Sequence, residues 1–242
     1  YDSRNNCNAI IETGSNTLIL GCKNTVIPEG IKVIGDYAYH YCKNLASITL
    51  PESVTSIGKC AFRYCMSLTF IDLPKDITLI DECAFEGCWS LQSVTLPKSL
   101  VELGESAFAE TKLESVTIPA NVKIIHKNPF PSSLTSIIVD SKNPYFDSRD
   151  NCNGIMDKMT NTLVLGCAKT VIPQSTVAIG DYAFSECDAL RGINIPPNVK
   201  TIGYNAFCSC DELQKIEIPE GVTELKSYAF AWCNHLTTVI LP

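Results

Sequence analysis

The chain contains 13 cysteines and three histidines, residue types that proteins use for metal binding and nucleophilic catalysis. Six of the cysteines recur at one position of a repeated pattern, after an Ala-aromatic pair and before a Leu: Cys42, Cys65, Cys88, Cys187, Cys210 and Cys233. Unpaired cysteine is among the most frequently buried residue types. This recurrence therefore predicts small core residues with free thiols rather than metal ligands or nucleophiles.

The remaining cysteines and histidines form no recognisable catalytic motif. Cys208 and Cys210 make a C-S-C sequence, but no second cysteine pair lies at the spacing of a zinc site. None of His40, His126 and His235 sits beside a plausible nucleophile, and the chain lacks G-x-S-x-G, H-E-x-x-H, P-loop and G-x-G-x-x-G motifs. The sequence therefore predicts a protein that is not an enzyme, without catalytic residues, metal or cofactor.

Two cysteine pairs and one acidic segment leave alternatives open. If the segments around them form symmetric hairpins, Cys7 faces Cys22 and Cys152 faces Cys167, and each pair either forms a cross-strand disulfide or stays reduced. The reduced state is favoured because the number of cysteines is odd. The segment DSRDNCNG at 147–154 is rich in Asp and Asn, which favour turns, but lacks the spacing of an EF-hand. We therefore expect a turn there rather than a calcium site.

Composition excludes several classes of protein. The 242 residues are 45% hydrophobic, which is typical of a folded chain. The net charge is −7 and the Lys and Arg residues are scattered, whereas a nucleic-acid-binding protein normally carries a basic stripe. No apolar run approaches the roughly 18 residues that span a bilayer. Because Tyr1 begins inside a pattern that recurs later, we expect the chain to be a piece of a longer one.

The positions of proline reveal an internal repeat. A spacing of 23 residues separates Pro28, Pro51, Pro74 and Pro97, and also Pro173, Pro196, Pro219 and Pro242. Each repeat reads P-x-x-V-x-x-I-G-x-x-A-F-x-x-C-x-x-L-x-x-I-x-L. The L-x-x-I-x-L part predicts a half-buried strand, V-x-x-I-G a second short apolar segment, and A-F-x-x-C a tight helical or 3₁₀ turn that directs Phe inward. One repeat cannot bury these residues alone, so the repeats must stack.

The chain also contains a duplication that is longer than this repeat. Residues 1–97 align without gaps on residues 146–242, so that DSRNNCNAI matches DSRDNCNGI. The two blocks are joined by irregular repeats at 98–145. Each block begins with two apolar runs around a Gly/Ser/Asn or Thr/Asn turn, which predicts a β-hairpin inserted at 1–28 and at 146–173.

The repeat LPESVTSIGKCAFRYCMSLTFIDLP resembles the BspA-like (Treponema pallidum-type) leucine-rich repeat family, and the resemblance covers essentially the whole chain. With the repeat pattern, it implies a β-rich α/β solenoid: a single right-handed superhelix over residues 1–242, with a parallel sheet, short helical or 3₁₀ turns and two β-hairpin insertions. It also implies a secreted or surface-exposed bacterial protein with an adhesive role. It implies no catalytic residue, because the family motif consists of core positions.

The outward positions of the predicted strands are the candidate binding face. Ser and Thr dominate this face, whose candidate residues are Ser47, Thr49, Phe70, Asp72, Ser93, Thr95, Asn194, Lys215, Glu217 and Thr238. One interpretation is that these residues merely form strands and tolerate water. The other is a non-enzymatic docking face for a protein or a host-surface component. A structural spacer is the alternative function, and an accessory glycan-binding role is weakly supported because Phe70 is the only aromatic on this face.

Overall fold

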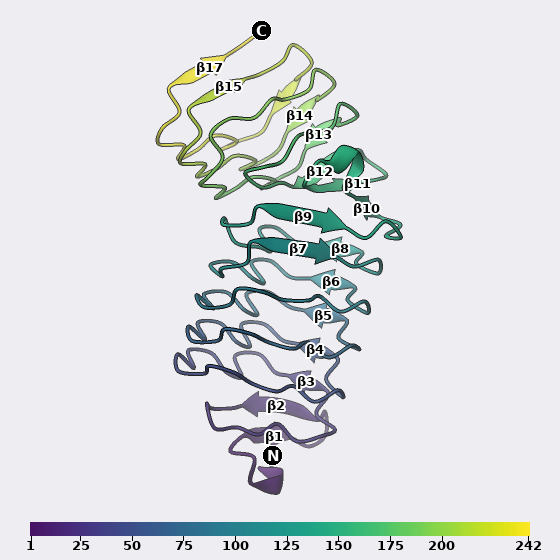
Figure 1. Cartoon of the computed structure of the whole chain (residues 1–242), viewed down its shortest axis with the longest axis vertical. Coiled ribbons are helices and arrows are strands. Elements are labelled where there is room, and N and C mark those ends of the chain that lie inside the picture. Colours follow the sequence, from purple (N-terminus) through teal and green to yellow (C-terminus); the bar gives the residue numbers. More distant parts are fainter. The chain divides into compact units, whose positions relative to one another are not determined.

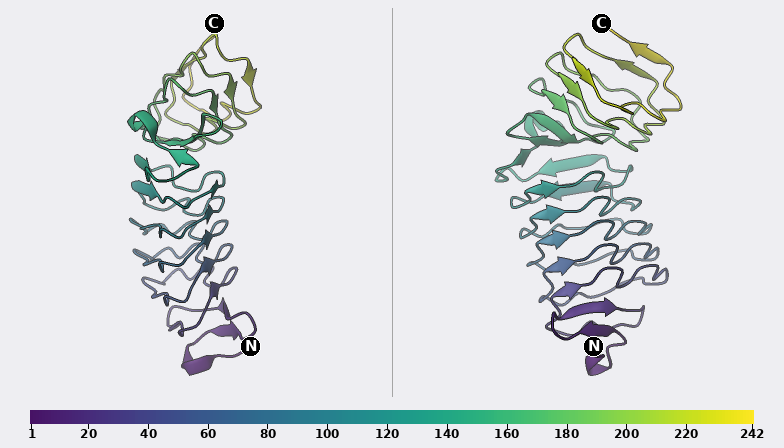
Figure 2. Two further views of the ribbon diagram at one scale, coloured as in Figure 1. Left: turned by 90° about the vertical axis from the view of Figure 1, so that its right-hand side faces the viewer. Right: turned by 180° about the vertical axis from the view of Figure 1, so that it is seen from behind.

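The computed structural model describes all 242 residues, which form two compact units. Unit 1 comprises Tyr1–Glu114 and Asn121–Pro131, and unit 2 comprises Ser115–Ala120 and Ser132–Pro242. Each unit is a stack of flattened turns of chain, called rungs below, with very short strands and almost no helix (Figures 1 and 2). The predicted parallel solenoid with two hairpins is confirmed. That both units continue as one solenoid over residues 1–242 stays a prediction.

Unit 1 is organised around one seven-stranded sheet. The hairpin strands pair antiparallel, all later neighbours pair parallel, and a 3₁₀ turn, η1 (Arg4–Asn6), precedes them. The strands, in their order in the sheet, are β1 (Ile10–Glu12), β2 (Thr17–Leu20), β3 (Val33–Ile34), β4 (Ser56–Ile57), β5 (Leu79–Ile80), β6 (Glu102–Leu103) and β8 (Ile124–Ile125).

Unit 2 repeats this plan and adds two smaller sheets. Its six-stranded sheet runs in the order β10 (Phe146–Asp147), β11 (Ile155–Asp157), β12 (Thr162–Leu165), β13 (Ala178–Ile179), β14 (Thr201–Ile202) and β16 (Glu224–Leu225). The 3₁₀ turn η2 (Arg149–Asn151) lies between β10 and β11. Two parallel pairs complete the unit: β7 (Ser115–Ile118) with β9 (Ser136–Val139), and β15 (Lys215–Glu217) with β17 (Thr238–Ile240).

The main parallel sheet does not lie where the sequence pattern placed its clearest strands. It is built from the x-I dyads of V-x-x-I-G, whereas residues 45–50, 68–73, 91–96 and 190–195 form no strand. Between these segments only isolated bonds join neighbouring rungs, such as Thr69 N–H to the Ala46 carbonyl at 3.4 Å. The equivalent segments of some other rungs do form the predicted strands, which pair as β7 with β9 and as β15 with β17.

The A-F-x-x-C turns are not helical, contrary to the prediction. Their N–H groups alternate between the same rung and the next: Ala38 N–H bonds the Gly35 carbonyl at 3.2 Å, and Tyr39 N–H bonds the Ala61 carbonyl at 2.7 Å. The alternation needs left-handed backbone at Tyr37 and Tyr41, with φ of 57° and 59°. Such a φ disfavours a residue with a Cβ by about 1–2 kcal/mol. The bonds to the next rung offset this cost.

A column of aromatic rings fills the core of each unit. Tyr39, Phe62, Phe85 and Phe108 stack nearly parallel in unit 1, with ring centroids 5.0, 5.2 and 5.1 Å apart, and none of them is exposed. In unit 2 the rings are those of Phe184, Phe207 and Phe230, at 5.0 and 5.2 Å. The predicted Phe ladder is confirmed. The inner rings of each column are therefore buried by their neighbours above and below, whereas the last ring, Phe230, is half-buried.

The repeated cysteines line the same core. All 13 cysteines are free, and Cys65, Cys88, Cys187 and Cys210 are buried, while Cys42 and Cys233 are half-buried. The thiol of Cys88 donates to the Phe62 carbonyl of the preceding rung at 3.2 Å, and the thiol of Cys210 does the same to Phe184 at 3.1 Å. Burial raises the pKa of Cys88 to about 12. These thiols are structural, as the repeat predicted.

Replacing one ring of the column tests this packing. Phe85→Ala should lower the free energy of unfolding by about 3–5 kcal/mol, because Phe85 has no exposed surface and leaves a cavity between two rings. Thr49→Ala, on the exposed side of its rung, should change it by less than about 0.5 kcal/mol. Urea denaturation measures both values, and equal midpoints would contradict the stacking of the rings.

The raised thiol pKa predicts a loss of stability in alkali. The buried Cys88 keeps its proton to about pH 12, whereas the same thiol in the unfolded chain loses it near pH 9. The thiol's contribution is therefore complete below pH 9 and falls as the pH rises toward 12, by about 1.4 kcal/mol per pH unit. In Cys88→Ala, the slope of unfolding free energy against pH should be shallower by this amount between pH 9 and 11. Identical slopes, measured in urea, would show that Cys88 ionises while folded.

Candidate functional site

The predicted binding face is exposed in unit 1. Side chains from three successive rungs, all of them exposed, make up this face: Ser47, Thr49, Phe70, Asp72, Ser93 and Thr95. They alternate with core residues such as Leu50, Ile71 and Leu96, so the segment between each Leu and Pro turns one side to the core and one to solvent. The sequence prediction of exposure is confirmed here, and binding stays a prediction.

A shallow depression lies on this face around Phe70. Its volume is about 460 Å³, and it is lined by Phe70, Ile71, Asp72, Leu73, Lys75, Ser93, Val94, Thr95, Pro97 and Lys98. The exposed ring of Phe70 supplies an apolar surface, and Asp72 and the two lysines supply both signs of charge. Four of the predicted residues therefore meet at one place. This combination suits a polar surface that also presents an apolar anchor.

A second hollow on the same unit holds two further predicted residues. Ser47 and Thr49 lie in a depression of about 300 Å³, opposite the segment that follows the first hairpin; its lining residues are Thr25, Val26, Ile27, Glu29, Ser47, Ile48, Thr49 and Pro51. This hollow carries one acidic group and no aromatic ring. It extends the candidate binding face without adding an aromatic side chain.

The predicted residues of unit 2 are exposed as well. Lys215 and Glu217 are on β15, and Thr238 stands opposite Lys215 on β17. Asn194 lies in the extended segment that forms no strand. These residues form an exposed polar surface without an aromatic ring, whereas the predicted residues of unit 1 include Phe70.

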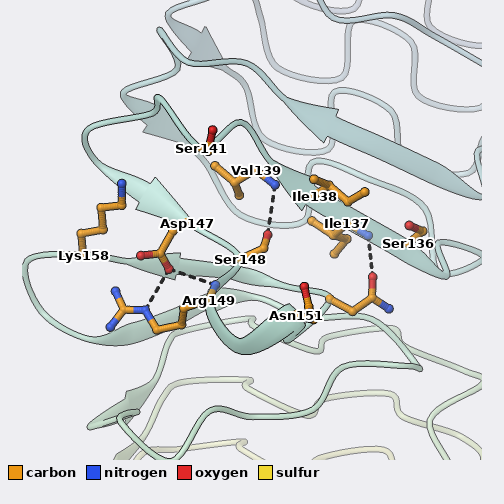
Figure 3. A pocket seen from close by; sticks show the side chains of 11 residues that line it. Ser136, Ile137, Ile138, Val139, Ser141, Asp147, Ser148, Arg149, Asn151 and Lys158 are labelled. Carbon is orange, nitrogen blue, oxygen red and sulfur yellow. Dashed lines mark hydrogen bonds and ion pairs between the residues drawn. The ribbon is translucent and has the colours of Figure 1, made fainter.

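A larger depression than those of unit 1 described above lies where the second hairpin meets β9, and the sequence prediction missed it. Its volume is about 680 Å³, and Figure 3 shows its lining: Ser136, Ile137, Ile138, Val139, Ser141, Asp147, Ser148, Arg149, Asn151, Asn153 and Lys158. The duplicated DSR and NCN sequences were the available signal, because they repeat polar residues that the core does not require.

Two side chains of the hairpin bind the backbone of β9 within this depression. The Asn153 side chain accepts a hydrogen bond from Ile137 N–H at 2.8 Å and donates one to the Thr135 carbonyl at 2.9 Å. The Ser148 hydroxyl accepts from Val139 N–H at 3.0 Å and donates to the Gly154 carbonyl at 2.8 Å. These bonds, two of them dashed in Figure 3, replace the partner strand that the edge of β9 lacks.

Two charged groups of this depression, Asp147 and Arg149, are engaged with each other, and the third, Lys158, donates to the Asn143 carbonyl. Arg149 Nε is 2.8 Å from Asp147 Oδ1, its Nη1 bonds Asn161 Oδ1 at 2.6 Å, and the hydrogen bond with Asp147 raises the pKa of Arg149. Asp147 Oδ1 also accepts from Arg149 N–H. The segment is therefore a turn held by its own side chains, as predicted. The structure groups no three His, Cys, Asp or Glu side chains that would hold a metal ion.

The hairpins place their cysteines out of register. Ile11 faces Leu18, but a bulge between Ile10 and Ile11 shifts the pairing so that Ile10 faces Leu20. Beyond the bulge Cys22 comes to lie beside Asn8, with its thiol 3.7 Å from the Asn8 carbonyl, rather than opposite Cys7. The expectation that Cys7 and Cys22 face each other was wrong. The same shift occurs between Ile155 and Met156, where the thiol of Cys167 lies 3.6 Å from the Asn153 carbonyl.

The three histidines have different kinds of partner. His126 Nε2 lies 3.0 Å from Glu102 Oε1, and His235 Nδ1 lies 2.6 Å from the Asp211 carbonyl oxygen. His40 is half-buried among tyrosines, and its pKa is lowered by burial and then by the charge of Arg63. The arrangement of these histidines gives no support to acid–base or nucleophilic catalysis.

Aromatic side chains gather on the turn side of unit 1, away from the predicted face. The rings of Tyr41 and Tyr64 are 4.8 Å apart, and His40 contacts Tyr41 at the same distance. The guanidinium of Arg63 lies over the Tyr64 ring at 4.8 Å, and Lys43 lies over Tyr41 at 5.1 Å. The cations therefore already occupy part of the ring faces that a sugar would stack on.

Comparison with known proteins identifies the repeat. A family model described as BspA type leucine-rich repeat region, in six copies, matches residues 18–138 and 165–242. Among curated proteins, no sequence matches the chain. No helix of the structure is long and apolar enough to cross a membrane.

Several solved structures share the fold. A leucine-rich repeat protein from Eubacterium ventriosum is 24% identical with a TM-score of 0.76, over 88% of this chain and 58% of that one. A leucine-rich cell surface protein from Faecalibacterium prausnitzii is 20% identical with a TM-score of 0.60, over 96% and 92%. The pneumococcal vaccine antigen PcpA is 22% identical with a TM-score of 0.59, over 81% and 62%. The chain thus spans less than two thirds of the first of these, and identities this low show the fold alone.

Equivalent substitutions in the two hairpins test the role of Asn153 in the depression of unit 2. Asn153→Gly should lower the free energy of unfolding by about 1–3 kcal/mol, because Ile137 N–H and the Thr135 carbonyl lose their partner. Asn8→Gly, the same change at the duplicated position, should cost under about 0.5 kcal/mol, because Asn8 is exposed. Both residues have positive φ, 55° and 54°, so the backbone effect of glycine cancels. Equal losses in urea denaturation would contradict the role of Asn153.

Proposed function

Because the chain belongs to the BspA-type leucine-rich repeat family, we propose that it is a non-enzymatic module that recognises a protein or another macromolecule of a host surface. Solenoids use their extended surfaces for binding, and the fixed positions of this repeat are spent on the core. The exposed positions of the repeat differ in residue type from rung to rung, and these positions can determine which partner is bound. The proposal includes a location at the cell exterior, and the Faecalibacterium protein is likewise described as a cell surface protein.

The observation that carries the proposal is the depression around Phe70. A phenylalanine that is 51% exposed has no role in the core of its own rung. Beside it, Asp72 and Ser93 provide acceptors and donors, and Lys75 and Lys98 provide positive charge at the rim. An apolar anchor inside a polar rim is the usual anatomy of a protein-binding surface. A spacer has no need for such an anchor.

The depression also favours a protein partner over a glycan. Glycan sites generally present several aromatic faces, and this surface presents one. The tyrosines on the turn side are partly covered by Arg63 and Lys43. The side chains around Phe70 carry both signs of charge, which suits a folded or extended polypeptide more than a neutral sugar chain.

Binding to a panel of purified serum and matrix proteins, measured by surface plasmon resonance, tests the proposal. For the proteins that bind, replacing Phe70, Asp72, Lys215 and Glu217 together with Ser should weaken binding at least about tenfold, a loss of about 1.4 kcal/mol. The unfolding midpoint should stay nearly unchanged, because all four side chains are exposed.

The pairwise variants locate the contact. Phe70→Ser with Asp72→Ser should account for most of the loss, and Lys215→Ser with Glu217→Ser is the matched control on the exposed surface of unit 2. Binding that survives the fourfold replacement would contradict a recognition role for the strand face. Absence of binding to every protein of the panel would favour the spacer.

A further inference from the structure

The two hairpins are copies of one sequence in different surroundings. Tyr1 is 83% exposed, whereas its counterpart Phe146 is 6% exposed. Ile10 is 43% exposed and its counterpart Ile155 is fully buried. Cys22 is exposed, whereas its counterpart Cys167 is buried. One face of the second hairpin is therefore covered, and the same face of the first hairpin is open.

The cover on the second hairpin belongs to unit 2 itself. The strand β9 of the rung that precedes the hairpin lies beside β10 and β11. Its Ile137 and Val139 turn their N–H groups toward the hairpin, where Asn153 and Ser148 accept them (Figure 3). In a strand the N–H groups of residues i and i+2 point to the same side, so two acceptors at this spacing select an extended segment.

The first hairpin carries the same binding groups. Asn8 and Ser3 occupy the positions of Asn153 and Ser148, and both are exposed. Asn8 holds a φ of 54°, close to the 55° of Asn153, so the backbone that aims this side chain is already formed. The Asn8 amide instead donates to the Asn24 carbonyl at 3.3 Å, a long bond at the surface. The Ser3 hydroxyl lies 3.8 Å from the Cys7 thiol, which is also a long contact. Both groups therefore have only weak partners here, with apolar Ile10 close in sequence.

We propose that the face of the first hairpin formed by Tyr1, Ser3, Asn8, Ile10 and Cys22 is a docking site for the edge strand of a leucine-rich repeat rung. The occupant has the chemistry of Leu134–Val139, Leu-Thr-Ser-Ile-Ile-Val: an extended segment that offers two backbone N–H groups two residues apart. The Asn8 amide binds the first N–H and the carbonyl two residues before it, and the Ser3 hydroxyl binds the second. The first hairpin thus binds the edge of another rung. This role is independent of the candidate binding face around Phe70.

The labelling rate of Cys22 by a thiol reagent tests the proposal on the intact 242-residue chain. A synthetic peptide of residues 132–145 is titrated in, and labelled residues are identified by mass spectrometry. The peptide should slow Cys22 labelling in a saturable way, because Cys167 is buried in the equivalent covered site. Asn8→Gly should weaken the apparent affinity at least about tenfold, and Ser3→Ala should weaken it as well.

Two controls make the result specific. A peptide with proline at the positions of Ile137 and Val139 lacks both N–H groups and should leave Cys22 labelling unchanged. Asn153→Gly alters only the second hairpin and should leave the peptide's affinity unchanged. The proposal is overturned if the peptide gives no protection at its solubility limit, if the proline peptide protects equally, or if Asn8→Gly binds as tightly as the unmodified chain.

Discussion

Everything in this protein depends on each rung being buried by the next. The core of a 23-residue rung consists of one aromatic ring and a few Leu, Ile or Val side chains, which cannot enclose one another. The ring of Phe85 loses its exposure only because Phe62 and Phe108 lie 5.2 and 5.1 Å away. The backbone obeys the same rule, since Phe85 N–H bonds the Ala107 carbonyl of the following rung. Core and hydrogen bonding are therefore both properties of neighbouring rungs.

The sequence predicts these inter-rung contacts well, because identical positions recur at a fixed spacing. Phe62, Cys65 and Leu68 are buried as the repeat requires. It predicts the local backbone less well. The V-x-x-I dyads form the two main sheets, whereas the longer apolar segments form strands only at β7, β9, β15 and β17, because pairing depends on how closely the backbones of neighbouring rungs approach. The left-handed Tyr37 and Tyr41 were also unpredictable, since tyrosine carries no signal for positive φ.

The candidate sites were likewise predicted only in part from the sequence. Alternation along a rung is enough to predict that Phe70, Asp72, Ser93 and Thr95 are exposed. It does not predict that they surround one depression, which depends on how adjacent rungs superimpose. The depression between β9 and the second hairpin depends on contacts between residues 135–139 and 147–153, which no local pattern connects. The bulge that separates Cys7 from Cys22 is likewise a property of backbone pairing.

The alternating hydrogen bonds of the turns have a mechanical consequence. Tyr39 N–H bonds the next rung and Cys42 N–H bonds its own, so each rung is held within itself as well as to its neighbour. A force applied along the stack of one unit would load the bonds between rungs in series, and the outermost rung would yield first. Each rung that opens would release 23 residues, up to about 80 Å of extended chain. Such a stack would lengthen by a similar amount each time a rung opens, and each opening would absorb work. The remaining rungs would stay folded, so the protein could act as an extensible tether.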